Sequence, residues 1–208
     1  TYSLEAMRVM TADAIDLNLS PSVVTAIAKF HMTEMSRTLL NDAFDIHSGR
    51  AIQVGPKNYL AHGYMGMPIS ITVEGANILT RNLMIFGQGA TRCHPYVLQE
   101  LEAAANPNAE EGLKQFDSLL MKHIGFAMGN TFGALFQGLT AGAFNSSPVA
   151  GETAKYYKQL SRMSRALALC ADFSMLMLGG DLKRKEMLSA RLGDVLSHLY
   201  IASAVLKF

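Results

Sequence analysis

Residues 20–49 read SPSVVTAIAKFHMTEMSRTLLNDAFDIHSG, and this stretch decides the expected fold class. Ser20 as N-cap and Pro21 in the first turn would begin a helix, and Gly49 would end it in a left-handed conformation. Apolar side chains recur every three or four residues between these ends, which is the spacing of one helix face: Val24, Ala28, Met32, Met35, Leu39, Ala43 and Ile46. The pattern predicts a long helix with one buried stripe.

The composition of the whole chain also favours helices. Half of its 208 residues are hydrophobic, with 13 Met and no Trp. Long runs of Ala, Leu and Met favour helix over sheet, because unbranched side chains lose little rotamer freedom in a helix. Apolar periodicity predicts further helices near residues 2–17, 76–86, 152–179 and 183–207, with apolar stripes that face a core. We predict an all-α fold, a helical bundle followed by a helical C-terminal extension.

Charge and cysteine content narrow the classes of function. The 18 basic residues balance the 17 acidic ones, and no basic stripe is interleaved with aromatic residues, so nucleic acid is not expected as a partner. Cys93 and Cys170 form neither a disulfide framework nor a zinc pattern, which favours the reducing cytoplasm. His94 follows Cys93 directly, and adjacent residues seldom face one another, so no metal is predicted. The start at Thr1 resembles an internal one, without a signal peptide.

Glu74-Gly75 is the most informative dipeptide for chemistry. It follows the stretch Gly63–Pro68, which reads as a loop, and precedes an apolar helix. Apolar neighbours would raise the pKa of the Glu74 carboxyl group toward the range of a general base, and Gly75 would let a ligand approach the backbone. An acidic residue near a helix N-terminus also serves simply to complement the helix dipole. The residue pattern alone leaves both interpretations open.

Three segments, 26–29, 41–50 and 71–81, resemble the C-terminal helical domain of the acyl-CoA dehydrogenases in order and spacing. Two later blocks, 181–186 and 191–200, resemble the C-terminal extension of the large bacterial fatty acyl-CoA dehydrogenases. The resemblance implies a helical bundle over residues 1–95, lacking its first helix, and a helical extension over residues 96–208. The polar stretch from Glu100 to Gly112 would contain the linker between them.

The same resemblance implies an activity. Glu74 corresponds to the family's base, which removes the α-proton of a fatty acyl thioester while the β-hydrogen leaves as hydride to FAD. Gly75 would lie beside the thioester, whose carbonyl oxygen would accept a hydrogen bond from the Glu74 N–H group. The implied function is oxidation of long-chain acyl-CoA to trans-2-enoyl-CoA in fatty acid β-oxidation, with electrons passed to an electron-transfer flavoprotein. Asn77 and Arg81 are weaker candidates for support.

Flavin contacts are implied at the end of the long helix. The family's Q-x-x-G-G motif resembles residues 45–49, where Asp45 replaces Gln and Ser48 replaces the first Gly, with His47 between them and Gly49 retained. His47 or Arg50 would offset the negative charge of Asp45 near phosphate. Ala76 and Ile78 replace polar residues of the family, so Asn77 or the backbone would supply the remaining flavin contact. A plain helix cap is the alternative interpretation of this turn.

Residues 124–144 carry no charge and contain five glycines. The stretch is nearly as long as a membrane span but only weakly hydrophobic, which favours a buried helix or hairpin. It suggests a rival function as a non-catalytic oligomerisation or membrane-docking module. The family resemblance implies a homo-oligomer, a cytoplasmic location with possible peripheral contact at the inner membrane, and an isolated fragment without activity.

Overall fold

The computed structural model describes residues 1–208, and it confirms the all-α fold because these residues form helices and no strand. The first half of the chain holds α1 (Tyr2–Asp16), α2 (Ser22–His47), η1 (Ser48–Arg50), α3 (Leu60–Thr72), α4 (Asn77–Leu79), η2 (Thr80–Gln88) and α5 (Gly89–Cys93). The second half holds α6 (Val97–Ala104), α7 (Ala109–Leu139), α8 (Ala154–Leu178), η3 (Gly179–Lys183) and α9 (Glu186–Lys207).

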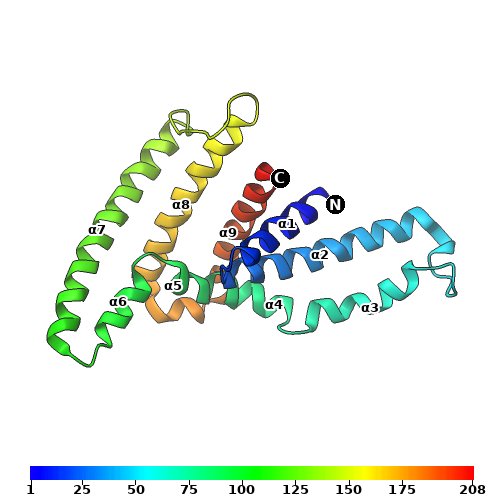
Figure 1. Cartoon of the computed structure of the whole chain (residues 1–208), viewed down its shortest axis with the longest axis horizontal. Helices are drawn as coiled ribbons and strands as arrows, with labels where there is room; N and C mark the ends of the chain where they lie inside the picture. Colours follow the sequence, from blue (N-terminus) through cyan, green and yellow to red (C-terminus); the bar gives the residue numbers. More distant parts are fainter.

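Two helical hairpins flank a central group of helices. In Figure 1, α2 and α3 form one hairpin and α7 and α8 form the other, with α1 and α9 between them. Four buried residues join α1 to α9 in the core: Ala6, Met7, Ile201 and Ala204. The last helix therefore packs on the first, so the two expected parts of the chain share a core. The division near residue 95 stays a prediction.

Both ends of α2 differ in detail from the expectation. The turn after α1 is confirmed, since Asn18 has a φ of 57° and interrupts the helix. Pro21 rather than Ser20 occupies the N-cap position, and no side chain accepts a cap hydrogen bond there. At the other end Ser48, not Gly49, is left-handed, with φ 53° and ψ −143°. The prediction that Gly49 supplies the left-handed cap is therefore wrong by one residue.

The expected loop at Gly63–Pro68 is instead part of helix α3. Asn58 precedes this helix and stabilises its first turn, because its Oδ1 accepts hydrogen bonds from the N–H groups of Leu60 (2.8 Å) and Ala61 (3.1 Å). The Tyr64 ring lies 4.6 Å from that of Phe44 on α2, centroid to centroid. Packing on α2 thus outweighs the low helix propensity of the glycines and of Pro68.

The sequence predicted a helix near residues 76–86 that would end at Gly87 and Gly89. The structure differs, because η2 adopts π-helical geometry and continues directly into α5. A Cβ atom on Gly87 would lie 3.0 Å from Ser189 Oγ, and one on Gly89 would lie 2.9 Å from Val23 Cγ2. Both glycines therefore permit close packing, against α9 and α2 respectively. Their role is contact rather than termination.

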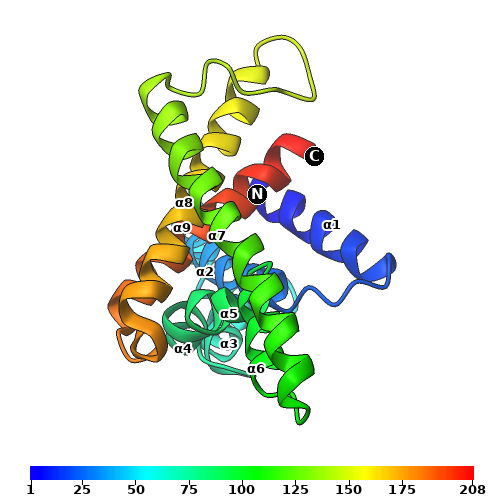
Figure 2. The same ribbon diagram turned by 90° about the vertical axis from the view of Figure 1, so that its left-hand side faces the viewer.

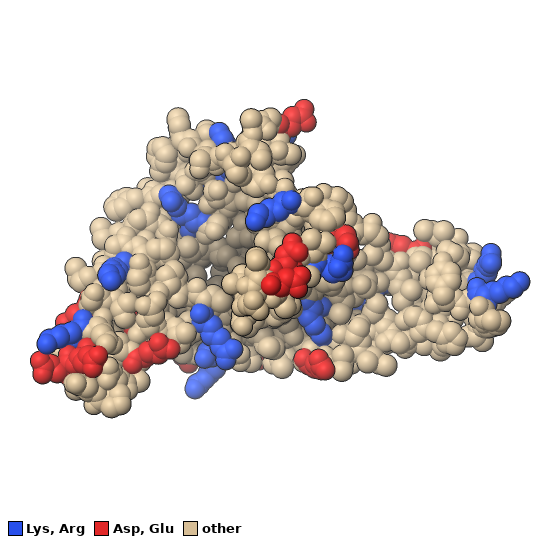
Figure 3. Space-filling model, in the orientation of Figure 1, with Lys and Arg blue, Asp and Glu red and all other residues tan.

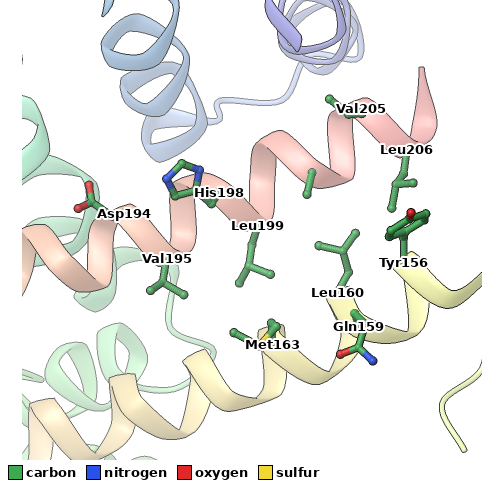
Figure 4. Close-up of a pocket in the computed structure, with 11 residues that line it drawn as sticks. Tyr156, Gln159, Leu160, Met163, Asp194, Val195, His198, Leu199, Val205 and Leu206 are labelled. Carbon is green, nitrogen blue, oxygen red and sulfur yellow. The ribbon is translucent and has the colours of Figure 1, made fainter. Parts of the chain in front are cut away.

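The apolar stripes that were expected to face a core are exposed or half-buried: Leu160, Met163, Leu167, Cys170, Phe173 and Met177 on α8, and Leu188, Leu192, Val195, Leu199 and Ala202 on α9. On α8, Phe173 and Met177 are 61% and 65% exposed, and no residue of the helix is buried. Helix α9 instead buries a face of mostly small residues, comprising Ser189, Ala190, Gly193, Ser197, Ile201 and Ala204. Small side chains allow α9 to approach η2 and α1 closely, which leaves its larger residues outside. They line an apolar groove of about 630 Å³ between α8 and α9 (Figure 4).

The charge-free stretch beginning at residue 124 is helical up to Leu139 but is not buried. Phe132 is 66% exposed and Leu139 81%. No helix of the chain combines the length and the apolar character that crossing a membrane requires. Helices α7 and α8 are in contact, and Figure 2 shows them crossing at an angle, joined by a loop at one end. The face in Figure 3 carries scattered charges of both signs between large uncharged areas.

His31 links the pH to stability at the contact between α2 and α9. Its ring lies 5.6 Å from that of His198, and its Nε2 is buried without a hydrogen-bond partner. Burial, followed by the charges of His198 and Arg81, lowers the pKa of His31, while the charges of Asp194 and Glu34 act in the opposite direction. The folded chain therefore takes up this proton less readily than the unfolded chain, whose His pKa is about 6.5.

We expect the free energy of unfolding to fall as the pH drops below about 6.5, with a contribution from His31 of at most about 1.4 kcal/mol per pH unit. Urea unfolding at pH 7.5 and 5.5 would measure this loss. His31→Gln should reduce the difference between the two pH values, whereas His62→Gln, at an exposed position, should leave it unchanged. An equal loss in the native protein and the His31→Gln variant would contradict the assignment to His31.

Candidate functional site

The Glu74-Gly75 dipeptide forms a strained turn between α3 and α4. Glu74 has a φ of 52° and Gly75 a φ of 107°, both in the region that favours glycine. A Cβ atom on Gly75 would meet nothing closer than Thr80 Oγ1 at 3.8 Å, so the backbone angle rather than crowding requires glycine there. A left-handed glutamate costs about 1–3 kcal/mol, and such strain tends to accumulate at functional sites. The structure thus gives Glu74 a special backbone conformation.

The apolar pocket expected around Glu74 is not formed by this chain. Glu74 is exposed, and its apolar neighbours are exposed as well: Ile69 (64%), Val73 (49%), Ile78 (71%) and Leu79 (46%). Ile69 lies on α3, and Ile78 and Leu79 lie on α4; their exposure, together with that of Glu74, shows that they do not bury the carboxylate. The prediction that these neighbours bury the Glu74 carboxylate is therefore wrong.

Three backbone N–H groups of the turn form no hydrogen bond within the chain. The N–H groups of Glu74, Gly75 and Ala76 donate no hydrogen bond to a backbone or side-chain acceptor of the chain. They lie between the end of α3 and the start of α4, where main-chain donors have no helical acceptor. Unpaired N–H groups beside an exposed carboxylate can bind a carbonyl oxygen that gains negative charge. This arrangement suits the contact between the Glu74 N–H group and a thioester.

Asn77 is fully engaged inside the protein. It is only 3% exposed, and its Nδ2 donates to Thr33 Oγ1 (2.9 Å) and to Glu34 Oε1 (2.8 Å). Its Oδ1 accepts from Lys29 Nζ at 2.6 Å. Both amide hydrogens and the oxygen are therefore used within the chain, and this geometry gives no support to the expected flavin contact. Lys29, Thr33 and Glu34 are site residues that the sequence analysis missed.

Arg81 supports the fold rather than the turn itself. Its Nε donates to Asp194 Oδ1 at 2.8 Å and its Nη2 to Asp194 Oδ2 at 2.5 Å, a two-pronged pair that ties η2 to α9. The hydrogen bond to Asp194 raises the pKa of the Arg81 guanidinium further above its usual value. Arg81 thus connects the helix that follows Glu74 to the C-terminal helix.

A hollow of about 340 Å³ lies beside the end of α2, where the flavin contacts were expected. His47, Arg50 and Lys57 are among its lining residues, whereas Asp45, Ser48 and Gly49 are not. The His47 ring bonds through Nδ1 to the Ala43 carbonyl at 3.0 Å. The cationic side chains of Arg50 and Lys57 suit a pyrophosphate, and the carboxylate of Asp45 is not in the lining. Of the four residues predicted in this turn, only His47 lines the hollow.

Ser48 occupies a backbone conformation that is nearly exclusive to glycine. We expect Ser48→Gly to raise the free energy of unfolding by about 1 kcal/mol, because released strain exceeds the added chain entropy of glycine. Gly49 has no positive φ and open space around it, so Gly49→Ala should be tolerated. Urea unfolding of the two variants measures both effects. A less stable Ser48→Gly variant would contradict the assigned strain.

A polar cluster that the sequence did not predict joins α6 and the turn before it to the middle of α7 and to α8. His94 Nε2 and Asp172 Oδ1 are 2.7 Å apart, and His123 Nδ1 lies 2.8 Å from Glu100 Oε1. Tyr96 stacks on His123 with the two ring planes 19° apart. These residues come from separate elements, so no sequence spacing could reveal the cluster.

The hydrogen bonds of His94 are those of a residue that joins helices. The N–H groups of Tyr96 and Val97 both donate to His94 Nδ1 at 3.2 Å, so His94 Nε2 carries the proton and donates to Asp172. A metal ion on His94 Nε2 would move that proton to Nδ1, directly opposite two N–H donors. The arrangement therefore fits hydrogen bonding between helices better than metal coordination.

Comparison with known proteins identifies the family. No solved structure matches the chain. A family model described as acyl-CoA dehydrogenase, C-terminal, bacterial type, matches residues 91–208, which is more than half of the chain. The match runs from α5 to the end of α9 and so contains the α7–α8 hairpin, the histidine cluster and Asp194. The chain therefore belongs to the bacterial-type acyl-CoA dehydrogenase C-terminal family.

Proposed function

We propose that this chain is part of an FAD-dependent dehydrogenase that oxidises long-chain acyl-CoA to trans-2-enoyl-CoA in fatty acid β-oxidation. Family membership supports an acyl-CoA dehydrogenase as the parent enzyme. The observation that carries the assignment to these residues is the strained turn, in which an exposed carboxylate stands beside three unpaired N–H groups. The isolated chain is proposed to be inactive.

In this proposal Glu74 takes the α-proton of the thioester on a carboxylate oxygen. The N–H group of Glu74 donates to the thioester carbonyl oxygen, which makes the α-proton more acidic. Gly75 lies beside the bound thioester and keeps the approach to the backbone open. Bound FAD would supply the acceptor for the β-hydrogen, which leaves the substrate as hydride. His47, Arg50 and Lys57 would hold its pyrophosphate, and the exposed turn suits a base that the remaining enzyme and substrate cover.

The finer assignments follow from this role. The electron acceptor is proposed to be an electron-transfer flavoprotein, and the enzyme is proposed to be a cytoplasmic homo-oligomer with possible peripheral contact at the inner membrane. The exposed apolar groove between α8 and α9 supports association with further protein surface. The uncharged face of α7 supports the same inference.

Anaerobic mixing of the complete flavoenzyme with a long-chain acyl-CoA tests the function. The proposal predicts that the visible absorbance of the flavin is bleached and that trans-2-enoyl-CoA accumulates in an equal amount. A flavin that stays oxidised with saturating acyl-CoA of every chain length would overturn it.

A second function, a non-catalytic assembly or membrane-docking module, is favoured by one observation. The outward face of α7 exposes large apolar side chains at helical spacing: Met121, Met128, Phe132, Leu135 and Leu139. A colourless protein that self-associates or binds liposomes would support the module. Gly129 is the better probe of this face, because a Cβ atom on Gly133 would collide with Arg165 of α8 while one on Gly129 meets nothing within 4 Å.

A further inference from the structure

Lys29 of α2 reaches across to the turn that carries Glu74. Its Nζ lies 2.8 Å from the Gly75 carbonyl oxygen, 3.3 Å from the Ile71 carbonyl oxygen and 2.6 Å from Asn77 Oδ1. An ammonium group has three hydrogens, and these three acceptors account for all of them. The two carbonyl groups belong to residues on either side of Glu74. Lys29 therefore connects the chain before Glu74 to the chain after it by hydrogen bonds.

Further hydrogen bonds around Asn77 hold the Lys29 side chain in this position. Asn77 accepts from Lys29 and donates to Thr33 Oγ1 and Glu34 Oε1, and Thr33 Oγ1 donates back to the Lys29 carbonyl oxygen at 2.8 Å. Burial raises the pKa of Glu34, but hydrogen bonds from Asn77 and Arg37 and the charges of Arg37 and Lys29 outweigh it, leaving this pKa lowered. Glu34 thus stays ionised at neutral pH. The network is closed, which fixes its geometry.

The hydrogen bonds of the Lys29 ammonium group act on the turn and do not form an ion pair. None of the ion pairs of the chain includes Lys29, although the residue is half-buried. Its charge is instead directed at main-chain carbonyl groups, which a charged donor binds about twice as strongly as a neutral one. A strained backbone persists only where its surroundings over-determine it. Lys29 provides that constraint for a glutamate with a φ of 52°.

We propose that Lys29, held by Asn77, is a positioning residue for the base: it fixes the left-handed turn that presents the Glu74 carboxylate and the N–H donors to the thioester. This inference rests on the proposed function of Glu74. It also assigns Asn77 a new role, because that residue acts on the turn through Lys29 and not on the flavin. A displacement of about 1 Å at a reacting group can cost about 100-fold in rate.

The test is stopped-flow bleaching of the complete flavoenzyme at saturating acyl-CoA. Lys29→Met should lower the first-order rate about 100-fold, with the Kd for acyl-CoA within about threefold of the native value. Lys29→Gln, which can donate only two hydrogens, should lose less, and it carries the test if Lys29→Met does not fold. Ile201→Val lowers stability in the distant core formed by α1 and α9, and it should keep the native rate.

Each outcome bears on the proposal. A rate within about threefold of native in a folded Lys29 variant would overturn the positioning role, provided that Glu74→Gln in the same series slows bleaching by at least about 10³-fold. An equally slow Ile201→Val variant would assign the loss to stability and overturn it as well. Failure of the native enzyme to bleach would refute the proposed function itself and remove the basis of the inference.

Discussion

Replacing Glu74 by glutamine is expected to slow the reduction of the flavin by acyl-CoA by about 10³- to 10⁴-fold in the complete enzyme. The amide has nearly the shape of the carboxylate and can occupy the same left-handed turn, so FAD and substrate binding should persist. Glutamine cannot accept the α-proton as a base, and for that reason the rate constant at saturation should fall rather than the affinity. Stopped-flow absorbance under anaerobic conditions measures both quantities.

The matched control is Glu152→Gln, which removes one exposed carboxylate from the loop before α8. It should keep the native rate. A Glu74→Gln enzyme that binds FAD and bleaches as fast as the native one would show that another group takes the proton. Loss of FAD from Glu74→Gln would instead place Glu74 in cofactor binding.

The second large effect concerns stability at the junction between α6 and α7. A Cβ atom on Gly112 would lie 2.7 Å from the Ala103 carbonyl oxygen and 3.0 Å from Asn106 Cβ. The first of these atoms belongs to the backbone and cannot rotate away, so α6 and α7 would have to separate. We expect Gly112→Ala to lower the free energy of unfolding by about 1–3 kcal/mol, measured by urea unfolding.

Gly125 on the same helix provides the opposite control. A Cβ atom there meets nothing within 4 Å, and alanine has the higher helix propensity, so Gly125→Ala should stabilise the chain by about 0.5–1 kcal/mol. Opposite signs for the two substitutions would confirm that Gly112 serves a close contact and Gly125 does not. A stabilised Gly112→Ala variant would contradict the packing of α6 on α7.

Periodicity alone predicted most helices of this fold. The stripes around residues 2–17, 20–49 and 152–207 gave helices close to the observed bounds, because apolar spacing and the Asn18 turn are local signals. The helical state of Gly63–Pro68 and of Gly87–Gly89 was not predictable in this way. There the contacts with α2 and α9 override low local propensity, and those partners are far away in the sequence.

The stripe of α8 illustrates a different limit. Phe173 and Met177 share one apolar face of α8 that was expected to face a core, but the sequence alone could not tell whether this chain covers that face. Helix α9 packs through small residues such as Ser189 and Ser197, which a search for large apolar residues overlooks. Helix also extends into the polar stretch Glu100–Gly112 from both sides, because α6 reaches Ala104 and α7 begins at Ala109.

For the candidate site, the sequence and its resemblance gave the position of Glu74 but not its supports. Lys29 was visible only as a single lysine within an apolar helical stretch, and nothing local connects it to Gly75, 46 positions later. Asn77 was expected at the flavin because Ala76 and Ile78 replace the polar residues of the family, whereas its amide turns inward to α2. That Lys57 lines the hollow could not be predicted from the sequence, because only the fold of the segment before α3 brings this residue near His47.

Exchange of substrate α-hydrogens is the most direct test of the central claim that Glu74 is the base. An acyl-CoA analogue with sulfur in place of the β-carbon has no hydride to give, so the complete enzyme in D₂O can exchange only the α-hydrogens, which mass spectrometry detects. We predict rapid deuterium incorporation with the native enzyme and none above background with Glu74→Gln that still binds FAD and the analogue. Equal incorporation in both would contradict the assignment.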